Sequence, residues 1–110
     1  MTHQTRARVL LADDHELVRE ALRSVLARES DLEVVGEARD GPEALEMARR
    51  LRPDLVIMDV RMPGMDGLAA TRATLAAVPS ARVVFLTSYE NRAYVLDAVR
   101  MGAAGYLLNC

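Results

Sequence analysis

The stretch RVLLADDHELVREALRSVL, residues 8–26, decides the fold because its pattern changes from that of a strand to that of a helix. Residues 8–13 form a short apolar run, which is typical of a buried β-strand. From about Glu16 to Glu29, apolar residues then recur at helical spacing, with arginines on the opposite side. The apolar positions are Leu17, Val18, Ala21, Leu22, Val25 and Leu26, and the arginines are Arg19, Arg23 and Arg28. The stretch therefore predicts a strand followed directly by an amphipathic helix.

The same alternation of strand and helix continues through the rest of the chain. Further strands are predicted at residues 32–38, 55–59, 82–87 and 105–108. Further helices are predicted from the first turn at Pro42 to Leu51, at residues 67–77 and at residues 91–101. Pro53, Pro79 and Gly102 follow these helices and end them. The element order is therefore (βα)4β.

Strands that alternate with helices form a parallel sheet, so the predicted fold is α/β. We expect a doubly wound, flavodoxin-like sheet of five strands in the order 2-1-3-4-5. Right-handed crossovers then place the first helix on one face of the sheet and the next three helices on the other. A fifth helix is absent from the sequence, which ends at Cys110. We therefore expect an exposed apolar strip over strands 3 to 5 on the face that carries the first helix, and a homodimer or other contact through it.

Composition describes one ordinary globular domain over residues 1–110. Hydrophobic residues make up 51% of the chain and charged residues 27%, and the formal net charge is -2. The polar start MTHQTRAR lacks the apolar core of a signal peptide, and no apolar run has the ~20 residues that a membrane span needs. We therefore expect a cytoplasmic protein without membrane contact. Cys110 is the single cysteine, which leaves no internal disulfide, and the chain has no lysine.

Acidic residues follow two of the predicted strands. Asp13 and Asp14 end the first strand, Asp59 ends the third, and Thr87 ends the fourth. In a doubly wound sheet the crevice beside the carboxyl ends of strands 1 and 3 is where ligands bind. Three carboxylates brought together there would repel one another unless they take up protons or hold a cation. Oxygen ligands without a cysteine or histidine favour Mg2+, with Asp59 as the nucleophile of a phosphoryl transfer.

Structural roles for the same residues are also open at this point. An aspartate after a strand more often caps a helix or forms a turn than acts in chemistry. The loop after Asp59 contains the turn Pro63-Gly64, and Asp66 can cap the next helix. The loop also brings backbone carbonyls beside Asp59, where one could bind the metal. His15 is expected near the site but solvated, without a role in catalysis.

Four motifs resemble the receiver domain of response regulators, closest to the branch that usually carries a C-terminal helix-turn-helix DNA-binding domain. They are VLLADDHELVREALRSVL, PDLVIMDVRMPGMDG, VVFLTSYE and AVRMGAAGYLLN, and the resemblance covers about residues 7–109. It implies that Asp59 is the phosphoacceptor. It also implies that Asp14 and Asp59 bind Mg2+ directly, that Asp13 acts through a metal-bound water, and that the backbone carbonyl of Arg61 is a further ligand.

The resemblance also implies how the domain works. The phosphoryl group would come from the phosphohistidine of a sensor histidine kinase, and the domain would assist its own phosphorylation and dephosphorylation without being an enzyme. Thr87 and Tyr106 would be the switch residues, and the output would be transcription through a DNA-binding domain beyond Cys110. From its position two residues after Thr87, Tyr89 is expected to shield the phosphoryl group and tune its lifetime.

Two departures from the family pattern keep other functions open. The family has a lysine after the GYLL segment, whereas this chain has Asn109, which can donate a hydrogen bond but carries no charge. Together with the absent fifth helix, this favours a second hypothesis, an interaction module that no longer switches on phosphorylation. A third hypothesis is a metal-dependent phosphatase that forms an aspartyl phosphate. The adjacent Asp13 and Asp14 and the short chain argue against it, because such enzymes usually separate the two aspartates by one residue.

Overall fold

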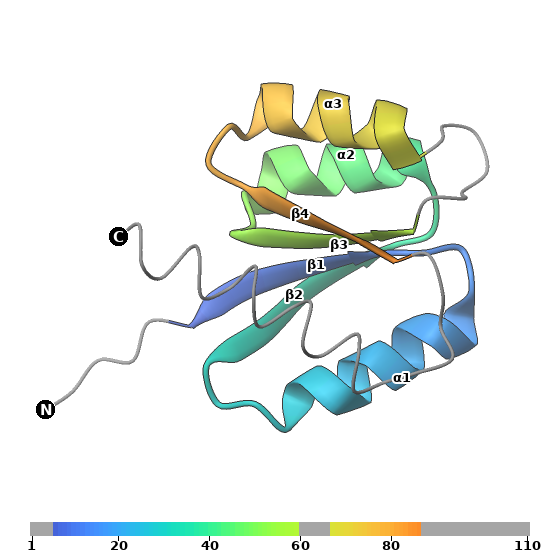
Figure 1. Ribbon diagram of the computed structural model, residues 1–110, viewed down its shortest axis with the longest axis vertical. Helices are drawn as coiled ribbons and strands as arrows, with labels where there is room; N and C mark the ends of the chain where they lie inside the picture. Colours follow the sequence, from blue (N-terminus) through green and yellow to red (C-terminus); the bar gives the residue numbers. More distant parts are fainter. Residues whose placement is uncertain (1–5, 60–66, 87–110) are drawn as a thin grey trace, which may run out of the picture.

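The computed structural model describes residues 6–59 and 67–86. The strands are β1 (Ala7–Ala12), β2 (Leu32–Ala38), β3 (Leu55–Asp59) and β4 (Arg82–Leu86), and the helices are α1 (Glu16–Ala27), α2 (Gly41–Leu51) and α3 (Gly67–Ala77). All strand pairs are parallel, and the sheet order is β2-β1-β3-β4 (Figure 1). This confirms the predicted order for four strands. The strand expected at residues 105–108 and the helix expected at 91–101 lie outside the described residues.

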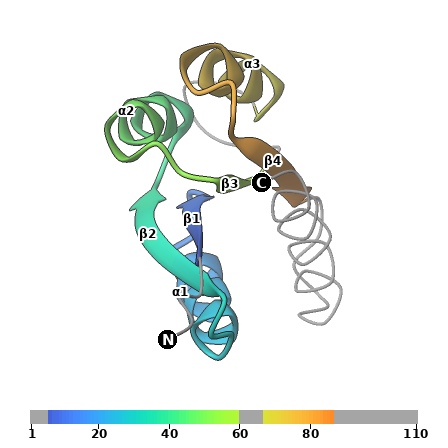
Figure 2. The same ribbon diagram turned by 90° about the vertical axis from the view of Figure 1, so that its left-hand side faces the viewer.

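The helices cover the sheet as the crossover rule predicts. Figure 2 shows α1 on one side of the sheet and α2 with α3 on the other. Successive side chains of a strand point to opposite faces. Val9 and Leu11 of β1 therefore belong to a buried cluster with Leu22 and Leu26 of α1, whereas Leu10 belongs to a second cluster on the face of α2 and α3.

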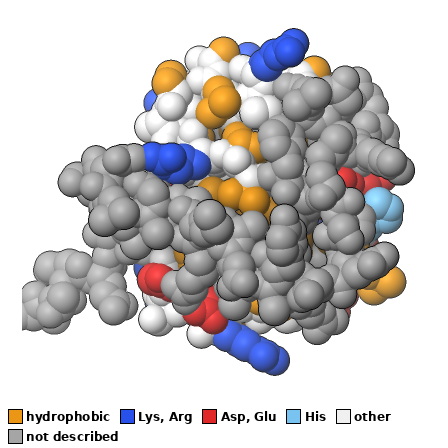
Figure 3. Space-filling model, in the orientation of Figure 1, with side chains coloured by type: hydrophobic (Ala, Val, Ile, Leu, Met, Phe, Trp, Pro, Cys, Tyr) orange, Lys and Arg blue, Asp and Glu red, His pale blue; other side chains and the backbone are white. Residues whose placement is uncertain are grey.

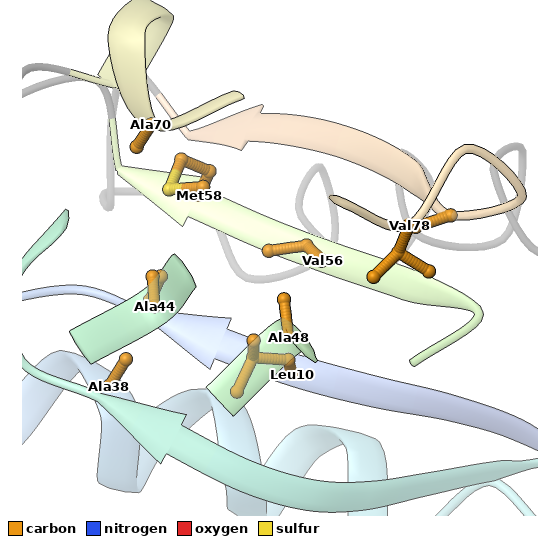
Figure 4. Close-up of a cluster of buried hydrophobic side chains, with 10 residues drawn as sticks. Leu10, Ala38, Ala44, Ala48, Val56, Met58, Ala70 and Val78 are labelled. Carbon is orange, nitrogen blue, oxygen red and sulfur yellow. The ribbon is translucent and has the colours of Figure 1, made fainter. Parts of the chain in front are cut away.

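The second cluster packs the central strands β1 and β3 against helices α2 and α3 (Figure 4). Its labelled members in the close-up are Leu10, Ala38, Ala44, Ala48, Val56, Met58, Ala70 and Val78. Every residue of β3 is buried, which is typical of a strand covered on both faces. The small side chains Ala44, Ala48 and Ala70 let α2 and α3 approach the sheet closely. This packing fixes β1 and β3 side by side, which is what brings their ends together.

The pairing of β1 with β2 contains a bulge. Val9 pairs with Val34, but the next residue, Leu10, pairs with Gly36, so Val35 is an extra residue in β2. The bulge shifts the alternation of side chains along β2. Val34 packs in the cluster on the face of α1, while Ala38 belongs to the cluster on the other face. Glu37 consequently points to the face of α1.

Local signals set both ends of α2. The Asp40 side chain accepts a hydrogen bond of 2.8 Å from the backbone N–H of Glu43, and Pro42 lies in the first turn as predicted. At the other end Arg52 has a left-handed backbone (φ 48°), the conformation that usually ends a helix with glycine. The guanidinium of Arg8 on β1 donates to the carbonyl of Leu51 at 2.6 Å and to that of Arg52 at 3.0 Å.

Two assignments in the first helix were wrong. Leu17 was placed on the apolar face but is 80% exposed, and Arg19 was placed on the polar face but is only 8% exposed. A helix turns by about 100° per residue, which centres the buried face on Val18, Leu22, Val25 and Leu26. Arg19 then lies at the border of that face, next to Leu26, and Leu17 lies well outside it. The helix also ends at Ala27, two residues earlier than expected, and β1 ends one residue earlier, at Ala12.

The expected exposed strip over strands 3 to 5 is not found on the described part of the sheet. Leu55 and Ile57 of β3 are each 1% exposed, and both share the buried cluster of Leu22 and Leu26. Among the described residues the exposed large apolar side chains are Leu17 and Leu75, both on helices. The prediction of an apolar strip was therefore wrong for β3, because these side chains are already packed. Within the described ranges, no helix is long and apolar enough to span a membrane.

Candidate functional site

The candidate site lies at the carboxyl ends of two neighbouring strands. Ala12 and Met58 are paired in the sheet, so the residues that follow them, Asp13 and Asp59, leave the sheet side by side. One ligand atom from each of Asp13, Asp14, His15 and Asp59 lies within 4.8 Å of the others. Figure 3 shows a histidine side chain (pale blue) beside acidic side chains (red) at the right-hand edge of the molecule. The predicted meeting of three carboxylates is confirmed.

Asp13 forms hydrogen bonds through its backbone and through one of its two carboxylate oxygens. Its side chain is 1% exposed, and its backbone N–H donates to the carbonyl of Ala38 at 3.0 Å. Oδ1 accepts a hydrogen bond from the backbone N–H of His15 at 2.8 Å. Oδ2 is buried and has no hydrogen-bond partner among the described residues. Burial raises the pKa of the Asp13 carboxyl, and the nearby charge of Asp59 raises this pKa further. A buried carboxylate oxygen that accepts no hydrogen bond is suited to bind a cation, or a water molecule that is itself bound to a cation.

Asp14 and Asp59 approach the site from different environments. The Asp14 side chain is 31% exposed, whereas Asp59 is 2% exposed at the end of the buried strand β3. Three carboxylates with different access to solvent form an oxygen-rich, anionic donor set. Hard divalent cations prefer such donors, and Mg2+ in particular binds through one or two carboxylates while keeping several waters. The residues present therefore fit Mg2+.

His15 contributes more to the site than its sequence position indicated. Its side chain is 56% exposed, as expected for a solvated residue. Its Nδ1, however, lies 2.8 Å from Oδ1 of Asp13 and 3.0 Å from Oδ1 of Asp14. The hydrogen bond to Asp13 raises the pKa of His15, and the charge of Asp14 adds to the effect. The protonated ring thus offsets part of the carboxylate charge. Its place directly after two aspartates was the only available signal for this contact.

Arg19 is a second residue that sequence reasoning missed. One nitrogen of its guanidinium, Nη1, donates to the backbone carbonyl of Asp13 at 2.6 Å. Its Nε donates to Oε1 of Glu37 at 3.2 Å, and the other oxygen of Glu37 accepts from Arg23. The interaction joins α1, β2 and the end of β1. A helical pattern that assigns arginines to the solvent side contains no signal for it.

Five further residues were predicted to belong to the site. Arg61, Thr87, Tyr89, Tyr106 and Asn109 all lie outside the described residues. Their assigned roles as metal ligand, switch residues, lifetime residue and altered lysine position stay predictions.

Comparison with known proteins identifies the family of the chain. The family described as response regulator receiver domain matches residues 9–109. The uncharacterized transcriptional regulatory protein YxjL of Bacillus subtilis is 41% identical over 106 residues, which are 96% of this chain and 49% of YxjL. The response regulator GacA of Pseudomonas viridiflava is 47% identical over 100 residues, which are 91% of this chain and 47% of GacA. The chain thus spans about half the length of the curated relatives it matches.

Solved structures give the same result for the fold. The signal receiver domain of the response regulator NarL from Mycobacterium tuberculosis has a TM-score of 0.72 and 37% identity, covering 89% of this chain and 79% of that one. A two-component response regulator of the LuxR family from Aurantimonas has a TM-score of 0.72 and 38% identity, covering 89% of this chain and 70% of that one. These similarities support the predicted branch. Since the family match covers almost all of the sequence, the chain belongs to the response regulator receiver domain family.

Proposed function

We propose that Asp59 is the residue on which this receiver domain accepts a phosphoryl group. The observation that carries the proposal is the gathering of ligand atoms from Asp13, Asp14, His15 and Asp59 within 4.8 Å at the ends of β1 and β3. Asp59 is the member that ends the fully buried central strand, so its carboxylate is fixed by the sheet. In phosphoryl transfer a protein acts mainly by positioning groups and offsetting charge. A fixed carboxylate beside a cation site meets both requirements.

Asp13, Asp14 and Asp59 would hold the Mg2+ ion. When bound, Mg2+ supplies positive charge that offsets the negative oxygens of the phosphoryl group. The buried Oδ2 of Asp13 supports the assignment, because it is an acceptor without a hydrogen-bond donor in the described part of the chain. The exposed Asp14 gives the ion a route from solvent. Contact through water at Asp13 and a carbonyl ligand from Arg61 remain part of the proposal.

The bonds that change in the transfer are those between the phosphoryl group, the carboxylate of Asp59 and the phosphodonor. An oxygen of Asp59 attacks the phosphorus atom, and the bond from phosphorus to the histidine nitrogen of the sensor kinase breaks. The electron pair of that bond stays on the imidazole, and an acyl phosphate forms on Asp59. Hydrolysis of the acyl phosphate, assisted by the domain, would return the free carboxylate. Thr87 and Tyr106 would report the state, and Tyr89 would set its lifetime.

The whole protein would be a cytoplasmic transcription regulator. Its relatives include proteins described as transcriptional regulators, and this chain corresponds to about half of their length. A sensor histidine kinase would be the phosphodonor, and DNA binding would belong to a domain outside this chain. The homodimer predicted from the sequence stays a prediction, which sedimentation of the phosphorylated and free forms would test.

Labelling with a small phosphodonor tests the proposal. We expect incubation with acetyl phosphate and MgCl2 to add one phosphoryl group, seen as a mass increase of the intact chain. Asp59→Asn, which keeps the shape of the side chain but removes its nucleophilic charge, should abolish the increase, and so should EDTA. Asp14→Asn serves as a matched control for the metal, since it should weaken Mg2+ binding while leaving the nucleophile in place.

The outcomes separate the three hypotheses from the sequence. Labelling that Asp59→Asn leaves unchanged would reject Asp59 as the acceptor. No labelling of the folded wild-type chain would favour an interaction module that does not switch, and Asn109→Lys should then restore labelling if the missing charge is the cause. Rapid turnover of a small phosphate ester without a stable product on the protein would favour the phosphatase.

A further inference from the structure

We propose that Arg19 is a positioning residue that orients the peptide between Asp13 and Asp14 and thereby shapes the Mg2+ site. This inference rests on the proposed function of the acidic cluster. Arg19 is 8% exposed, and the described buried residues that carry a charge are Arg19, Asp13 and Asp59. An arginine is rarely buried unless its donors are paired. The partners of Arg19 therefore indicate what it does.

The first partner is the backbone of the site itself. Nη1 of Arg19 donates to the carbonyl oxygen of Asp13 at 2.6 Å. That carbonyl belongs to the same planar peptide unit as the N–H of Asp14. The hydrogen bond from Arg19 therefore fixes the orientation of this peptide plane. The orientation of the plane determines in turn where the Cα atom of Asp14, and with it the Asp14 side chain, begins. The Asp14 side chain is 31% exposed, so the protein packs around it less closely than around Asp13, which is 1% exposed.

The second partner is Glu37, which holds the guanidinium in place. Oε1 of Glu37 accepts from Nε of Arg19 at 3.2 Å, and its Oε2 accepts from Arg23. The Arg19 side chain is 10% exposed and that of Arg23 is 49% exposed. Both arginines lie on α1 and bind the same carboxylate, but of the two it is Arg19 that also donates to the carbonyl of Asp13. Arg23 is thus a natural control.

Asp13 is then held from three directions. Its N–H donates to Ala38 of β2, its Oδ1 accepts from the N–H of His15, and its carbonyl accepts from Arg19. The buried Oδ2 is the acceptor that these contacts leave for the site. Partners of this kind, one step removed from a metal ligand, orient it, and their loss typically weakens metal affinity about 10- to 100-fold.

The test compares two arginine substitutions on one helix. Arg19→Met keeps an unbranched side chain of similar length but removes the donors, and Arg23→Met removes the neighbour. We expect calorimetric titration with MgCl2 alone to show affinity about tenfold weaker for Arg19→Met and within about twofold of wild type for Arg23→Met. Glu37→Gln, which loosens Arg19 without deleting it, should lie between them.

A second readout separates positioning from a general loss of structure. In acetyl phosphate labelling, the MgCl2 concentration for half-maximal rate should rise about tenfold in Arg19→Met, while the rate at saturating MgCl2 should change by less than about threefold. Arg19→Lys, which keeps a charged ammonium donor group but lacks the planar guanidinium fork, should recover part of the affinity. If Arg19→Met does not fold, the pair Arg19→Lys and Arg23→Lys gives the same comparison.

The proposal is overturned if Arg19→Met binds Mg2+ as tightly as wild type, or if Arg23→Met weakens binding equally. A wild-type chain that neither binds Mg2+ nor becomes labelled would instead reject the proposed function. The two failures are therefore distinguishable in one set of titrations.

Discussion

His15 hydrogen-bonds to Asp13 twice, because its backbone N–H and its ring Nδ1 each lie 2.8 Å from the same oxygen, Oδ1. The ring also lies 3.0 Å from Asp14. A cationic imidazole at this place partly compensates two carboxylates that would otherwise repel each other. The contact links the protonation of an exposed histidine to the stability of the metal-free site.

The stability of the metal-free protein should therefore depend on pH through His15. Because the folded pKa of His15 is raised above 6.5, its stabilising contribution is complete below pH 6.5 and is lost as pH rises through the raised value. In EDTA and low salt, the free energy of unfolding should fall over this range. His15→Gln should show a shallower fall in urea unfolding series. His3 is present in both proteins, so its titration contributes equally to both series. An identical dependence of the unfolding free energy on pH in the wild type and in His15→Gln would contradict the role of His15.

Asp13 should lower stability in the absence of a metal. Burial raises the pKa of Asp13 above 3.8, so the ionised carboxylate destabilises the fold, and stability rises as pH falls through the raised pKa. Asp13→Asn imitates the neutral form and should raise the free energy of unfolding in EDTA. Millimolar MgCl2 should stabilise the wild type but add much less to the variant. Destabilisation of the variant in EDTA would contradict this account.

Arg52 offers a test of the end of α2. Its φ of 48° is unfavourable for a residue with a Cβ atom but not for glycine. Arg52→Gly should therefore stabilise the protein by about 0.5–1 kcal/mol in chemical unfolding, net of the greater freedom of glycine in the unfolded chain. Arg50→Gly, an exposed position inside the same helix, should instead destabilise by about 1 kcal/mol. Equal effects at both positions would argue against strain at Arg52.

The acidic cluster could be predicted from sequence because a topological rule determines it. Once Asp13 and Asp59 were assigned to the ends of neighbouring parallel strands, their meeting followed without any side-chain detail. The same reasoning correctly gave the sheet order for four strands and the helix covering each face. Patterns of period 2 and 3.6 were sufficient, since the four described strands and three described helices are short and regular apart from one bulge.

The contact between Arg19 and Glu37 could not be predicted in this way. Strict alternation along β2 places Glu37 on the same face as Glu33, away from Leu32 and Val34. The extra residue at Val35 reverses this and puts Glu37 on the face of α1, where Arg19 lies. A bulge depends on how two strands pair, so no pattern within β2 alone discloses it.

The bulge at Val35 also bears on how the molecule avoids unwanted assembly. Among the described strands β2 is at the end of the sheet and pairs only with β1, which leaves its other edge without a strand. A long, regular edge is a template on which another chain can add a strand and start aggregation. The irregularity beside Gly36 interrupts the even spacing of N–H and C=O groups along that edge. A single extra residue thus makes this edge a poorer template for an added strand.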